Sequence, residues 1–90
     1  SADSHVSITK ENVRINDDGV SNFLLQDVIG RFNKGDGWII SWNACDDDNL
    51  PVIILLGTNT KTNASILSVM RDNNRCDYYI VADQVKYTIL

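Results

Sequence analysis

Residues 21–34 have the sequence SNFLLQDVIGRFNK, and this stretch decides which fold the chain is expected to adopt. Its apolar residues fall within one stripe of a helical wheel, which predicts an amphipathic helix with a core-facing side. Ser21 suits the N-cap, because its hydroxyl can accept from the free amides of the first turn. Gly35 suits the residue after the helix, where a left-handed conformation is common. The stripe consists of Leu24, Leu25, Val28, Ile29 and Phe32.

The sequence before this helix predicts strands, because Val6 and Ile8, and then Val13 and Ile15, alternate with polar residues. The parity of the apolar positions changes across residues 9–12. A side chain's face in a strand is fixed by odd or even position, so this change requires a bulge or a tight turn.

After the helix, residues 37–44 predict a strand with every second residue on one face, from Trp38 through Ile40 and Trp42 to Ala44. Residues 52–56 are apolar without alternation, as expected for a strand that is covered on both faces or lies in the middle of a sheet. The sequence predicts the last strands at residues 76–82 and 85–89.

Residues 63–73 fit two structures. Ile66, Leu67, Val69 and Met70 form a helical stripe, and we favour a helix; the alternative is a strand that makes a hairpin with residues 52–56. With the helix, the order becomes β-α-β-β-α-β. This order predicts a single α+β domain over residues 1–90, a ferredoxin-like split β-α-β-β-α-β sandwich. Its four-stranded, mainly antiparallel sheet carries two helices on one face, with strand order 4-1-3-2.

The composition excludes some partners. The chain has a net charge of −4, whereas nucleic acids and anionic membranes require clustered Lys and Arg, so neither is expected as a partner. Glu and Lys are scarce, and Asn, Thr and Ser are abundant. This composition favours a secreted protein, with a cytoplasmic location as the alternative.

Two cysteines, Cys45 and Cys76, allow one disulfide or two free thiols. A secreted location favours the disulfide. The 4-1-3-2 sheet opposes it, because it places the two residues on opposite edges, roughly 14 Å apart at about 4.8 Å per strand. A disulfide needs Cα atoms within about 7 Å. A bridge would therefore require a different sheet order or a folded-over loop.

The chain contains little that could carry catalysis. His5 is the only histidine, the cysteines lack C-x-x-C spacing, and the sequence DDDN at residues 46–49 is interpreted as a solvated turn rather than a cation site. We expect no metal, no cofactor and no enzymatic activity. An acid-pair hydrolase whose carboxylates cannot be identified is the alternative.

The aromatic residues of the strands suggest binding. Trp38, Trp42, Tyr79 and Tyr87 are predicted to form a partner-binding patch on a sheet face, although they could instead fill the core. An open edge strand, at residues 38–43 or 85–90, could also pair with another chain to form a homodimer. The expected function is a non-enzymatic protein-binding module, such as a small secreted toxin, effector or inhibitor that presents a sheet face or edge to a protein target. The alternative is an intracellular regulatory domain that dimerises edge to edge and binds a small ligand.

Overall fold

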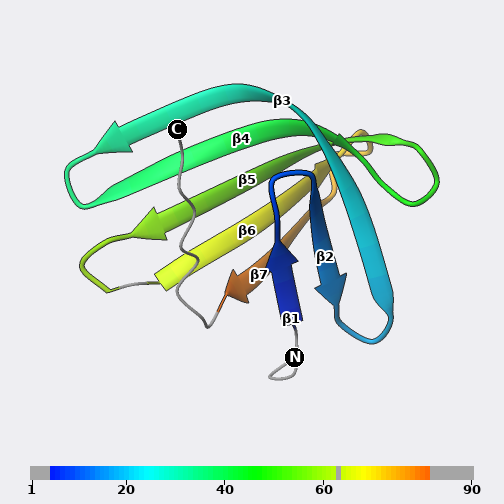
Figure 1. The fold of residues 1–90 in the computed structure, drawn as a ribbon, viewed down its shortest axis with the longest axis horizontal. Helices are drawn as coiled ribbons and strands as arrows, with labels where there is room; N and C mark the ends of the chain where they lie inside the picture. Colours follow the sequence, from blue (N-terminus) through cyan, green and yellow to red (C-terminus); the bar gives the residue numbers. More distant parts are fainter. Residues whose placement is uncertain (1–4, 63, 82–90) are drawn as a thin grey trace.

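Seven antiparallel strands in sequential order make up the described part of the chain in this computed structural model, which covers residues 5–62 and 64–81. The sheet curls into a half-barrel, so that β1 and β7 come close to each other across the opening (Figure 1). The strands are β1 (His5–Ile8), β2 (Asn12–Asn16), β3 (Val20–Lys34), β4 (Gly37–Cys45), β5 (Pro51–Asn59), β6 (Ala64–Arg71) and β7 (Cys76–Val81).

The predicted α+β ferredoxin-like fold is wrong, because no helix occurs in the described residues and the sheet has seven strands instead of four. Residues 21–34 lie in β3, which pairs with β2 from Val20 to Leu24 and with β4 from Leu24 to Lys34. The register shifts twice, between Leu25 and Val28 and between Val28 and Gly30. Each extra residue moves the following side chains to the other face of the sheet. The predicted helical stripe is therefore not one face of β3: Leu25 is buried, whereas Leu24, Val28, Ile29 and Phe32 are exposed.

The second predicted helix is also wrong. Residues 64–71 form β6, which pairs with β5 in the hairpin considered as the alternative. Ser65, Leu67 and Val69 point into the core, and Ile66 and Met70 point away from it. The predicted helical stripe mixed residues from the two faces of this strand.

The remaining predicted strands are confirmed where the structure describes them. Residues 37–44 and 52–56 lie in β4 and β5, and residues 76–81 form β7. The parity change at residues 9–12 is a tight turn between β1 and β2, closed by the amide of Thr9 donating to the carbonyl of Asn12 at 2.9 Å. Residues 85–89 lie outside the described residues.

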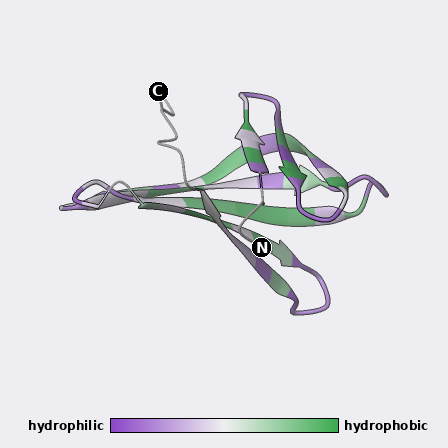
Figure 2. Ribbon diagram, turned by 90° about the horizontal axis from the view of Figure 1, so that it is seen from below, coloured by the Kyte–Doolittle hydropathy of each residue, from purple (hydrophilic) through white to green (hydrophobic). Residues whose placement is uncertain are grey.

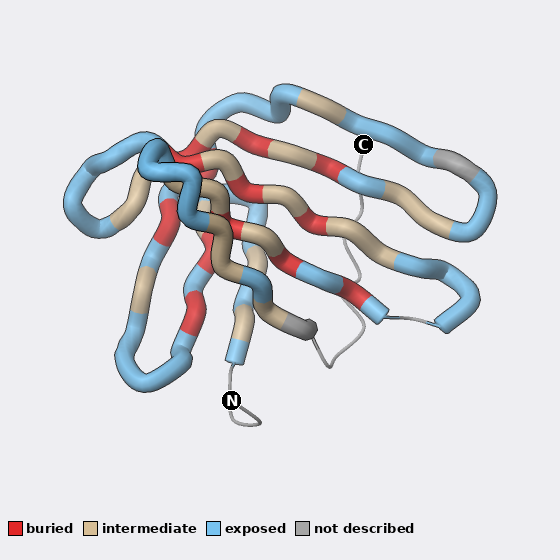
Figure 3. Tube along the Cα trace, turned by 180° about the vertical axis from the view of Figure 1, so that it is seen from behind, coloured by how far each residue is buried: buried red, intermediate tan, exposed pale blue. Residues whose placement is uncertain are grey.

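The core lies inside the curl, where alternate residues of β2, β4, β5 and β6 and the first half of β3 are buried (Figure 3). Trp42, Ile54 and Val69 are cross-strand neighbours on β4, β5 and β6, and the β1–β2 hairpin and the first half of β3 cover them. The buried apolar residues are Val13, Ile15, Phe23, Leu25, Ile40, Trp42, Ala44, Val52, Ile54, Leu56, Leu67 and Val69.

The expected Cys45–Cys76 disulfide is wrong, and both thiols are free. Cys45 ends β4 and Cys76 begins β7, so β5 and β6 lie between them. Three strand spacings correspond to about 14 Å, which is twice the largest separation that a disulfide can bridge.

Candidate functional site

The side of the sheet that faces away from the core is uncharged and partly apolar, and we call the outward positions of β4, β5 and β6 the outer face. Five outward positions lie on β4, five on β5 and four on β6. None of these fourteen positions holds Asp, Glu, Lys or Arg. They are Gly37, Ile39, Ser41, Asn43, Cys45, Pro51, Ile53, Leu55, Gly57, Asn59, Ala64, Ile66, Ser68 and Met70.

The absence of charge on the outer face is unusual for this chain. Charged residues make up 22% of the sequence, so about three of the fourteen positions would hold one if charge were spread evenly. Ile39 is 43% exposed and Ile66 is 49% exposed, and Ile53, Leu55 and Met70 are half-buried. Figure 2 shows hydrophobic residues along the strands and hydrophilic ones mainly at the hairpin ends. An exposed apolar surface without charge is typical of the centre of a protein interface.

Neighbouring strands extend this surface on both sides. On β3, Phe32 pairs with Ile39 and is 59% exposed. On β7, Tyr78 pairs with Ser68 and is 70% exposed. Interaction with Cys76, chiefly a side-chain hydrogen bond, raises the pKa of Tyr78 above its ordinary value.

The aromatic residues predicted to bind a partner lie mostly on the other side of the sheet. Trp42 is 2% exposed in the core, and Trp38 and Tyr79 are half-buried and pack against the same core. Tyr87 lies outside the described residues. Sequence reasoning chose aromatic residues and missed Ile39, Ile66 and their neighbours. The signal that could have identified this face was the unbroken apolar run at residues 52–56, which makes both sides of β5 apolar.

The predicted edge at residues 38–43 belongs to β4, which lies between β3 and β5. Among residues 5–62 and 64–81, the second half of β3 is an edge instead, because β2 pairs with β3 only as far as Leu24. Both bulges of β3 lie beyond that point, and bulges are a common way to keep an edge strand from pairing with another chain.

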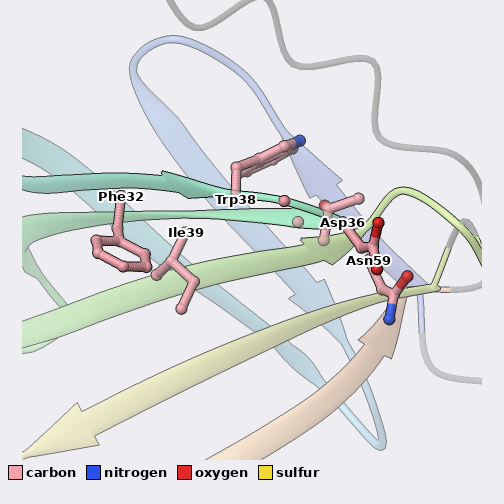
Figure 4. Close-up of a pocket in the computed structure, with 8 residues that line it drawn as sticks. Phe32, Asp36, Trp38, Ile39 and Asn59 are labelled. Atoms are coloured by element: carbon pink, nitrogen blue, oxygen red, sulfur yellow. The ribbon is translucent and has the colours of Figure 1, made fainter.

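An open hollow of about 550 Å³ lies at the tip of the β3–β4 hairpin (Figure 4). Phe32 and Ile39 project from one side of the sheet, and Trp38 projects from the opposite side. A single small ligand could not contact all three side chains. The hairpin is tied to the β5–β6 turn, because the amide and hydroxyl of Thr60 both donate to the carbonyl of Asp36, at 2.6 and 2.7 Å.

The acidic turn at residues 46–49 has a structural role. Oδ1 of Asp46 accepts from the amides of Asp48 and Leu50, and Oδ2 accepts from Nη1 of Arg71 at 3.0 Å. The Asp47 carboxylate accepts from the amide of Asn22 on β3 at 3.1 Å. Two of the three aspartates therefore hold the turn against the sheet.

Within residues 5–62 and 64–81, no three His, Cys, Asp or Glu residues come together as a possible metal-binding group. The same residues include no helix that is long and apolar enough to span a membrane. Comparisons of the chain with protein-family models, curated proteins and solved structures found no match.

Proposed function

We propose that this chain is a non-enzymatic protein-binding module whose docking surface is the outer face of β4, β5 and β6. The observation that supports the proposal is the uncharged, partly exposed apolar surface around Ile39, Leu55 and Ile66. Apolar area exposed to water is costly, and covering it with another protein removes that cost. A secreted toxin, effector or inhibitor is the class of protein that we expect, with an intracellular regulatory protein as the alternative.

Site-specific photo-cross-linking tests the proposal. A photoreactive residue is placed at Ile66, on the outer face, and in a second variant at Leu50, an exposed apolar residue of the β4–β5 loop that serves as the control. Each variant is irradiated in extract or fluid from the source of the chain. We expect a defined protein adduct from Ile66 only, identified by mass spectrometry.

Competition shows whether the adduct depends on the outer face. Excess unlabelled chain should abolish it, whereas excess chain carrying Ile39→Lys and Ile66→Lys should not, because two ammonium groups would have to be buried in an apolar interface. Equal adducts from Ile66 and Leu50, or none from either, would overturn the proposal.

A further inference from the structure

We infer that the protein which covers the outer face is a second copy of this chain, so that the two sheets pack face to face in a twofold-symmetric dimer. This inference rests on the proposed function and names its partner. It is drawn from the order of large and small side chains on the outer face, from its lack of charge and from its size.

Two adjacent rows of residues cross the outer face. The upper row runs from Ile39 on β4 through Gly57 on β5 to Ile66 on β6. The lower row, two residues along each strand, runs through Ser41, Leu55 and Ser68. Large and small residues alternate along both rows and between them. Where one row has a projecting side chain, the other has a hollow on the same strand.

Consider a twofold axis that lies between the two packed sheets and runs perpendicular to the strands, midway between the two rows. Rotation about this axis makes the pattern of large and small residues complementary to itself. The axis places each strand over the same strand of the partner copy and the upper row over the partner's lower row. Leu55 then projects into the hollow at the partner's Gly57, and the reverse contact follows by symmetry. Ile39 likewise faces Ser41 and Ile66 faces Ser68, so large residues meet small ones on all three strands.

The same axis extends the match to β3. Phe32 pairs with Ile39 in the upper row, and Gly30 pairs with Ser41 in the lower row. Phe32 of one copy therefore faces Gly30 of the other. Packed sheets cross at about 30°, so the contact should be closest at β5 and looser toward β3.

Charge favours a second copy over a foreign protein. The chain has a net charge of −4, and two copies that met through charged surfaces would repel each other. The outer face is a region where they can meet without burying a charge. A foreign partner is commonly selected by complementary charge, and this face offers none.

The size of the outer face fits a weak dimer. Its three strands, β4 to β6, span about 15 Å, and nine residues of an extended strand span about 30 Å, so the face covers about 450 Å². Two such faces bury at most about 900 Å², which is below the range of standard specific interfaces. We therefore expect a dimer that forms only at high protein concentration.

Gly57→Leu tests the packing directly by filling the central hollow. A Cβ at Gly57 would meet Cγ1 of Ile39 at 3.6 Å, an ordinary contact, so the single copy should tolerate the substitution. In the dimer, the introduced leucine would collide with the partner's Leu55, twice by symmetry. The matched control is Ser7→Leu, which adds the same side chain at an exposed position of β1.

Sedimentation equilibrium of the purified chain is the measurement. We expect the wild type and Ser7→Leu to approach twice the 10.1 kDa mass of one chain as the concentration rises. Gly57→Leu should raise the dimer dissociation constant at least about tenfold. Adding Leu55→Ala to Gly57→Leu exchanges the projection and the hollow, and should restore the dimer.

The outcomes separate this inference from the proposed function. A wild type that stays monomeric, or a dimer that Gly57→Leu leaves intact, would overturn the inference. A dimer that Gly57→Leu breaks and Leu55→Ala does not restore would overturn the stated axis. If the purified chain is monomeric but Ile66 cross-links to a different protein, the proposed function stands and only the choice of partner is wrong.

Discussion

Removing the Asp46 carboxylate should release the β4–β5 loop from the sheet. Its Oδ1 accepts from the amides of Asp48 at 2.9 Å and Leu50 at 2.8 Å, and its Oδ2 accepts from Nη1 of Arg71 at 3.0 Å. The side chain is 12% exposed, so water has little access to the groups that it binds. Asp46→Ala therefore removes three hydrogen bonds to one ionised acceptor.

The expected loss follows from the number and kind of these bonds. A hydrogen bond to a charged group contributes about 1.5–3 kcal/mol, and we discount the sum by about half because the freed loop amides can turn toward water. Asp46→Ala should lower the free energy of unfolding by about 2–4 kcal/mol. Asp46→Asn keeps an oxygen for the two loop amides and loses the charge opposite Arg71, so its loss should be about half as large.

Urea denaturation measures the effect as a shift in the midpoint with an unchanged slope. Asp48→Ala is the matched control, because its side chain lies exposed in the same turn, and its effect should stay within about 0.5 kcal/mol. Equal losses for Asp46→Ala and Asp48→Ala would show that the carboxylate of Asp46 does not hold the loop.

Three further predictions follow from other parts of the sheet. Thiol alkylation of the denatured protein without reductant should label both Cys45 and Cys76, and a mass lower by two hydrogens with no label would contradict the sheet order. Burial raises the pKa of Tyr79 above its ordinary value of 10.0, so its contribution to stability is complete below pH 10 and is lost as the pH rises through the folded-state pKa. The free energy of unfolding of the wild type should therefore fall as the pH is raised above 10, and in Tyr79→Phe it should fall less. An equal fall in the two proteins would show that Tyr79 does not cause it. Gly37→Ala should destabilise the protein by about 1–3 kcal/mol in urea denaturation, because its Cβ would lie 2.7 Å from the carbonyl oxygen of Thr58, and wild-type stability would contradict this close approach.

The candidate site shows how far residue type alone can be misleading. Trp42 is the kind of residue that interfaces favour, but its position on the inward side of β4 places it in the core. Ile39 and Ile66 attract less attention in a sequence, and they are the residues left exposed. Which side of β4 is covered depends on where the β1–β2 hairpin folds, and no local pattern of β4 contains that information.

The structure also explains why some strands could be predicted and others could not. Residues 37–44 alternate regularly because β4 keeps one register along its whole pairing with β5, so the period of the sequence equals the period of the strand. In β3, the extra residues around Val28 and Ile29 break that period. A bulge is defined by the partner strand, so its position cannot be recognised from the bulged strand alone.

The sequence by itself determined the short-range features: the strands at residues 37–44 and 52–56 and the tight turn at residues 9–12. Tertiary pairing decided the state of residues 21–34 and 64–71, because their apolar spacing is compatible with both a helix and a strand and only a neighbouring strand can supply the hydrogen bonds of a sheet. Tertiary structure also decided which apolar face became the core and which stayed outside. Each side of β5 is hydrophobic enough to be buried, and the curl of the sheet around one side leaves the other side uncovered.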